Sequence, residues 1–291
     1  MKSKKILVLA LLLFAGLLLT GCTAISANSW PGVSFDSTSN TVFVAFNSHV
    51  FAVDAESGNQ KWRFPQEADR NTTFFAVPVL SDDGQLVVGS YNKTLYSIDA
   101  STGAENWSFV GAGNRYIGSV LVYDNTIFAP NADERLYALD LNGNPIWDVP
   151  FKASQALWAA PSPNPDSNTL YITSMDRNVY AIDPTTGSQQ WKTAMSGAMV
   201  GSPKVDDAGQ VLVGNFANQI VSLNAQDGQE NWTGATSGWV WAEPALEGDA
   251  IYFGDLNGYF YSFDRMTGSE NWKIQPDGQV VGSPLVIGDR I

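Results

Sequence analysis

The side chains with the strongest intrinsic chemistry are scarce in this sequence. His49 is its only histidine and Cys22 its only cysteine, so a zinc site of Cys and His ligands and a disulfide within the chain are both excluded. His49 is expected in a turn between the second and third strands of the first repeat, with no acidic or nucleophilic partner close in sequence. The sequence therefore predicts no catalytic residues and no metal site, and we expect a protein that is not an enzyme.

Aromatic side chains at equivalent points of the chain could bind a ligand instead. Trp158 and Trp241 occupy matching positions just before two predicted inner strands, and Trp239 and Tyr116 lie beside such positions. A rim of aromatic rings can hold a sugar ring or an apolar peptide side chain. The alternative is that these rings only close the space between neighbouring structural units.

One acidic residue also departs from its equivalents and is a further ligand-binding candidate. Glu243 stands where the related positions carry small side chains, namely Val77, Ser119, Ala160, Ser202 and Ser283. A carboxylate at such a position needs a partner, for which Arg115 and water are the candidates.

These candidates are positioned by an internal repeat that fills most of the chain. In six copies, an apolar strand residue is followed by an Asp or Asn, then by a turn Gly and then by a Trp. The six tryptophans are Trp62, Trp107, Trp147, Trp191, Trp232 and Trp272, separated by 45, 40, 44, 41 and 40 residues. This period matches one four-stranded propeller blade. Each Trp is expected to be structural, because a large flat ring can fill the space between two sheets.

The run from Ala181 to Trp191, which reads AIDPTTGSQQW, resembles the tryptophan-docking motif of the quinoprotein-like (PQQ-like) β-propeller repeat family. The resemblance covers about residues 30–291 and implies an all-β propeller of four-stranded blades. Some members of this family are dehydrogenases that hold pyrroloquinoline quinone over calcium. This sequence has no vicinal cysteine pair and no evident cluster of oxygen ligands, so we expect no cofactor, and a quinone-dependent dehydrogenase stays a remote alternative.

The number of blades is open at this point. Six repeats are complete and a seventh begins at Val281, which favours a truncated ring of seven or eight blades. The alternative is a compact six-bladed ring with a short tail. Open blade edges are costly to leave unpaired, which is why closure is expected in propellers.

The N-terminus predicts export and lipidation. Lys2, Lys4 and Lys5 precede an apolar run from Ile6 to Leu19, as in a secretory signal peptide. The run ends in Leu19-Thr20-Gly21-Cys22, which resembles the lipobox of bacterial lipoproteins. Residues 1–21 are therefore predicted to be the signal peptide, 22–29 a tether lipidated at Cys22, and 30–291 the propeller.

Charge and anchoring together suggest the class of function. A formal net charge of −13 argues against nucleic acid as a partner. Repeat content and anchoring are similar to those of the propeller lipoproteins of the outer-membrane β-barrel assembly machinery. The resemblance implies an exported scaffold that binds an envelope protein or peptide, anchored to the outer membrane if the cell has one and otherwise to the outer face of the plasma membrane. The alternative is a surface binding module for a carbohydrate or other small ligand at the aromatic channel mouth.

Overall fold

The computed structural model describes residues 32–69, 71–288 and 290–291. All regular structure within these ranges is β-strand, and no helix there is long and apolar enough to cross a membrane. The predicted signal peptide (1–21) and tether (22–29), including Cys22, lie outside the described residues.

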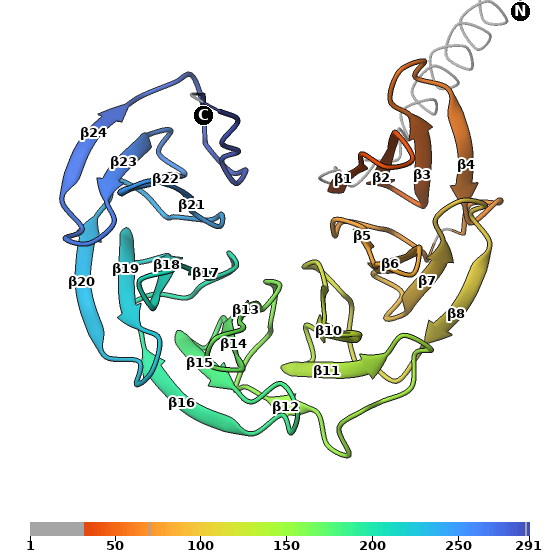
Figure 1. Cartoon of the computed structure of the whole chain (residues 1–291), viewed down its shortest axis with the longest axis horizontal. Helices are drawn as coiled ribbons and strands as arrows, with labels where there is room; N and C mark the ends of the chain where they lie inside the picture. Colours follow the sequence, from red (N-terminus) through yellow and green to blue (C-terminus); the bar gives the residue numbers. More distant parts are fainter. Residues whose placement is uncertain (1–31, 70, 289) are drawn as a thin grey trace, which may run out of the picture.

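The strands form six four-stranded antiparallel sheets, which we call blades 1 to 6, and the strands of each blade follow one another along the chain (Figure 1). Blades 1 and 2 contain β1 (Gly32–Asp36), β2 (Thr41–Phe46), β3 (His49–Asp54), β4 (Gln60–Phe64), β5 (Val79–Leu80), β6 (Gln85–Gly89), β7 (Leu95–Asp99) and β8 (Glu105–Phe109). Blades 3 and 4 contain β9 (Leu121–Tyr123), β10 (Thr126–Pro130), β11 (Arg135–Asp140), β12 (Phe151–Lys152), β13 (Ser162–Asn164), β14 (Thr169–Thr173), β15 (Asn178–Ile182) and β16 (Gln189–Ala194). Blades 5 and 6 contain β17 (Lys204–Val205), β18 (Gln210–Asn215), β19 (Gln219–Asn224), β20 (Glu230–Ala235), β21 (Ala245–Glu247), β22 (Ala250–Gly254), β23 (Phe260–Asp264) and β24 (Glu270–Ile274).

The blades stand side by side around a common axis, with the first strand of each blade innermost and the last strand outermost (Figure 1). The predicted all-β propeller of four-stranded blades is thereby confirmed. Figure 1 shows an open arc in which blades 1 and 6 do not meet, so the alternative of a compact six-bladed ring is wrong for this structure. In the part of the seventh repeat that the structure describes, no strand forms, and the backbone pairing is an isolated bridge between Ile287 and Arg290.

The repeat tryptophans dock each blade onto the next one. The indole N–H of a Trp on the outer strand, or in blade 3 just before it, donates to the carbonyl that follows the Asp or Asn of the next blade. These bonds join Trp62 to Ala100, Trp107 to Leu141, Trp147 to Pro184, Trp191 to Ala225 and Trp232 to Arg265, over 2.8–3.1 Å. The core accordingly lies in layers between the blades, as where Phe43 and Trp62 of blade 1 pack with Ile98 of blade 2.

A glycine in each following blade makes room for the docked ring. Gly103 has φ +76°, and a Cβ added to it would lie 2.7 Å from the Trp62 ring, so only glycine fits there. No described tryptophan ring docks on Gly58 of blade 1, and a Cβ added to this glycine would have nothing within 4 Å. At the other end of the arc, Trp272 has no following blade among the described residues and is 40% exposed, against 6% for Trp62.

Blade 3 departs from the regular pattern. Its outer strand β12 has only two residues, and its turn is one residue shorter between Asp140 and Gly143 than the turns of the other blades. Pro145 and Pro150 lie at the two ends of the segment just before β12. Each lacks the backbone N–H that a longer outer strand would use for pairing. Ile146 and Val149 in this segment are exposed.

Candidate functional site

Five loops that connect the outer strand of one blade to the inner strand of the next are held in the same way. We call them the mouth loops: residues 73–75, 115–117, 156–158, 198–200 and 239–241. The first residue of each accepts a backbone hydrogen bond from the turn between the second and third strands of the blade that follows. The donors are the N–H groups of Tyr91, Ala132, Met175, Phe216 and Leu256, and the acceptors are the carbonyls of Thr73, Arg115, Ala156, Ala198 and Trp239, over 2.8–3.2 Å.

The middle residue of each mouth loop is an anchor that is buried under the preceding blade. The anchors are Phe74, Tyr116, Leu157, Met199 and Val240, none more than 1% exposed. Tyr116 packs so closely on Gly89 that a Cβ on that glycine would lie 2.3 Å from the Tyr116 Cβ. The prediction that Tyr116 lines the rim is wrong, because neighbouring residues of the loop point in different directions and Tyr116 occupies the buried position. Burial raises the pKa of the Tyr116 phenol well above its ordinary value.

The flanking residues of the mouth loops instead surround a cavity, which we call the mouth pocket. It has a volume of about 360 Å³ and is lined by Tyr91, Arg115, Ile117, Trp158, Val200 and Trp241. An adjoining cavity of about 400 Å³, here called the axial cavity, shares Trp158, Val200 and Trp241 with it. The structure thus brings Trp158 and Trp241 together at the boundary between the two spaces. Volumes of this size are typical of small-ligand sites.

Stacked rings stiffen two sides of the mouth pocket. On one side the Phe216 ring stacks on Trp241 and on Trp239, at centroid distances of 5.4 and 4.7 Å. On the other side Phe75 stacks on Tyr91 at 4.2 Å, and the Arg115 guanidinium lies 5.0 Å above the Tyr91 ring. Trp239 is 48% exposed and does not line the pocket, so it extends the aromatic surface outward.

Glu243 lines the axial cavity among small side chains, at the position that the repeat predicts. Its partner is Lys204 of blade 5, whose Nζ lies 3.0 Å from Oε1, and the expectation of Arg115 as its partner is wrong. The two side chains are 38% and 33% exposed, so the ion pair contributes little to stability.

The axial cavity does not fit a quinone held over calcium. Such a site needs several converging oxygen ligands. Glu243 is the one acidic side chain that lines this cavity, and it is already paired with Lys204. Within residues 32–69, 71–288 and 290–291 no group of three or more His, Cys, Asp or Glu side chains is placed to hold a metal ion.

His49 lies at the first position of β3, opposite Phe46, and away from the mouth pocket. Its Nε2 is buried without a hydrogen-bond partner, and burial together with the Arg63 charge lowers the pKa of its imidazole. The residue is thus less solvated than a turn histidine would be.

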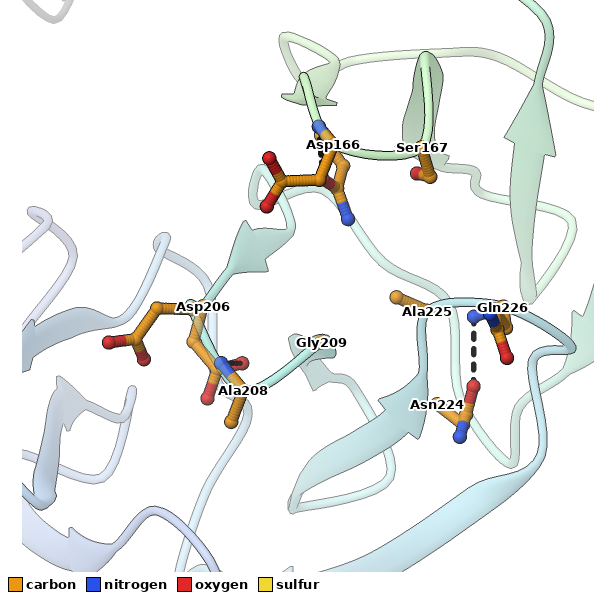
Figure 2. A pocket seen from close by; sticks show the side chains of 10 residues that line it. Asp166, Ser167, Asp206, Ala208, Gly209, Asn224, Ala225 and Gln226 are labelled. Atoms are coloured by element: carbon orange, nitrogen blue, oxygen red, sulfur yellow. Dashed lines mark hydrogen bonds between the residues drawn. The ribbon is translucent and has the colours of Figure 1, made fainter.

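A third cavity, of about 420 Å³, lies at the opposite end of the strands, between blades 4 and 5 (Figure 2). Its polar side chains mostly serve their own turns. Both carboxylate oxygens of Asp206 accept hydrogen bonds from Gln210, and Figure 2 shows the Asn224 side chain turned back to the backbone N–H of Gln226. The exposed Asp207 is paired with Arg265. This arrangement shapes turns and offers no set of groups directed at a ligand.

Two contributions to these cavities were not assigned from the sequence. Arg115 was not grouped with the tryptophans, although Arg115 and Trp239 occupy the same loop position, where the other loops carry Thr73, Ala156 and Ala198. Lys204 follows the blade 5 equivalent of Glu243 by two residues, so comparing neighbouring inner strands would have identified it as the partner.

Six antiparallel four-stranded sheets around one axis, each linked to the next by a docked tryptophan, define a β-propeller of PQQ-like repeats. The model of the family described as outer membrane protein assembly factor BamB matches residues 46–274. This match covers most of the sequence, and the chain belongs to that family.

Individual relatives are distant and match in part. The outer membrane protein assembly factor BamB of Burkholderia pseudomallei (strain K96243) is 26% identical over 125 residues, which are 43% of this chain and 31% of the relative. That of Nitrosomonas eutropha (strain DSM 101675 / C91 / Nm57) is 23% identical over 108 residues, which are 37% of this chain and 25% of the relative. The crystal structure of BamB from Moraxella catarrhalis superposes with a TM-score of 0.71 at 18% identity, covering 85% of this chain and 76% of that one, and supports the fold.

Proposed function

We propose that this chain is a non-enzymatic, lipid-anchored propeller that acts as a protein-interaction scaffold in the bacterial cell envelope, in the assembly of outer-membrane proteins. The observation that carries the proposal is the family match over residues 46–274, together with two relatives named as assembly factors. The rigid mouth loops and the exposed Trp239 ring support the mouth end as the surface that meets an envelope protein.

Site-specific photo-crosslinking in living cells tests the scaffold role. A photoreactive amino acid is placed at Trp239, and in a matched control at Thr185, an exposed turn residue at the opposite end of the strands. The expected result is a crosslink from position 239 to a component of the outer-membrane assembly machinery, identified by mass spectrometry, and none from position 185. Equal crosslinks from both positions, or adducts with unrelated proteins alone, would contradict the proposal.

Lipid anchoring depends on Cys22, and Cys22→Ser is expected to remove it. The serine variant has no thiol to carry the lipid, so the chain loses the apolar anchor that holds it at a membrane. Mass spectrometry of the mature N-terminus and membrane fractionation check this, with Thr23→Ser as the control that keeps the thiol. A Cys22→Ser chain that still fractionates with the membrane to the same extent would show that something else anchors it.

A ligand-binding role is the second candidate, and the mouth pocket is the observation that favours it. Its walls are mainly aromatic and apolar, as in sites that bind ring-shaped ligands. The class of ligand follows from Arg115, the one charged side chain in its lining.

A further inference from the structure

The charge of the mouth pocket is opposite to that of the chain. The protein carries 29 acidic and 16 basic residues, yet the only charged side chain that lines this pocket is Arg115. No ion pair joins Arg115 to an acid within the described residues. Its guanidinium rests over Tyr91, a contact that leaves its edge N–H groups available to an anion.

The position of Arg115 is set by its own loop. Its carbonyl accepts a hydrogen bond from Ala132, and its N–H donates to the Asn114 side chain. The next residue is the buried anchor Tyr116, so the backbone on both sides of the guanidinium stem is held. Because this backbone is already held, binding at Arg115 does not have to order the loop, which lowers the entropic cost of binding.

The remaining walls match a flat apolar group. Trp158 and Trp241 face the same space as Tyr91, and Phe216 and Phe75 back Trp241 and Tyr91 by stacking. The Trp158 indole N–H itself is buried and has no acceptor in the protein. About 360 Å³ accommodates an aromatic ring with a short polar substituent.

We propose that the mouth pocket binds an aromatic ring that carries a carboxylate, with the ring among Trp158, Trp241 and Tyr91 and the carboxylate on the Arg115 guanidinium. The ligand class covers small aromatic acids and the C-terminal residue of a peptide that ends in an aromatic side chain. This site goes beyond the scaffold role and does not depend on it, since the assay below uses the purified chain without any partner.

Calorimetric titration of the purified full chain with N-acetylphenylalanine and with its amide tests the proposal. The two probes share the ring and differ in charge. Wild type is expected to bind the acid roughly tenfold more tightly than the amide, because guanidinium and carboxylate form charge-assisted hydrogen bonds. Equal affinities for the two probes, or no saturable binding of either, would overturn it.

Four variants assign the preference to particular residues. In Arg115→Met the preference for the acid should disappear, in Arg115→Lys it should be reduced but remain, and in the matched control Arg63→Met, which removes an exposed arginine outside the pocket, it should be unchanged. Trp158→Ala should weaken acid and amide alike. An acid preference that survives in Arg115→Met, or is lost in Arg63→Met, would contradict the assignment of the preference to the Arg115 guanidinium.

Two peptides distinguish the sources of the ligand. A peptide with a free C-terminal phenylalanine that binds more tightly than N-acetylphenylalanine identifies a polypeptide terminus, and the same peptide with an amidated end should then lose affinity. Binding of the small acid alone identifies a small molecule. Either result supports the site. Affinities that are the same in wild type and Arg115→Met for every probe would overturn it.

Discussion

Replacing Trp232 with alanine is expected to lower the free energy of unfolding by about 3–5 kcal/mol, whereas the same change at Trp272 should cost about 1 kcal/mol or less. Trp232 is 9% exposed, and its indole N–H donates to the Arg265 carbonyl at 3.0 Å. Its removal leaves a cavity between blades 5 and 6 and an acceptor without its donor. Trp272 occupies the same place in its blade but is 40% exposed.

Urea unfolding of the two variants beside wild type gives the comparison, with the shift in midpoint as the measured quantity. Both variants remove the same atoms from the same strand position, so their difference isolates docking onto a following blade. Equal losses at the two positions would mean that each Trp stabilises its own blade, and the docking role would then be wrong.

The repeat explains why the blades and the docking tryptophans could be predicted. An Asp or Asn, a Gly and a Trp recur in register, and each has one structural task in every copy: turn, positive φ and docked ring. The short outer strand of blade 3 has a local cause, because Pro145 and Pro150 remove backbone N–H donors from its edge. The angle between neighbouring blades, which Figure 1 shows as an open arc, was not predicted, because it is a property of the whole assembly and not of one repeat.

The candidate site was only partly predictable, for a different reason. Trp158 and Trp241 stood out because they break the repeat at one position, and they share the mouth pocket. Tyr116 was assigned by proximity in sequence, although the direction of its side chain depends on Gly89 of the preceding blade. The Lys204–Glu243 pair spans two blades, and such contacts require the register between inner strands.

Replacing Asp255 with alanine is expected to lower the free energy of unfolding by about 3 kcal/mol or more, and also to weaken binding at the mouth pocket, which Asp255 does not line. Asp255 is fully buried. Its Oδ2 accepts from the Gly238 N–H at 2.7 Å and from the Tyr261 hydroxyl at 2.8 Å, and its Oδ1 accepts from two N–H groups of its own turn. Alanine leaves these buried donors without acceptors.

The effect on the pocket follows from what Asp255 holds. Gly238 immediately precedes the mouth loop 239–241, and Leu256, next to Asp255, donates to the Trp239 carbonyl at 3.0 Å. Loss of the carboxylate therefore frees the loop that places Trp241 in the pocket wall. Asp249→Ala, which removes an exposed acid from the same blade, is the control and should change stability by about 0.5 kcal/mol or less.

Urea unfolding and titration with N-acetylphenylalanine, applied to both variants at a temperature where each is folded, separate the two effects. A stability loss with unchanged affinity would mean that the stacking of Phe216 on Trp241 holds the wall without the loop. A loss of both, confined to Asp255→Ala, is the expected result. That result would mean that the buried hydrogen bonds of Asp255 maintain the geometry of the mouth pocket, because the residues that contact the ligand are unchanged in this variant.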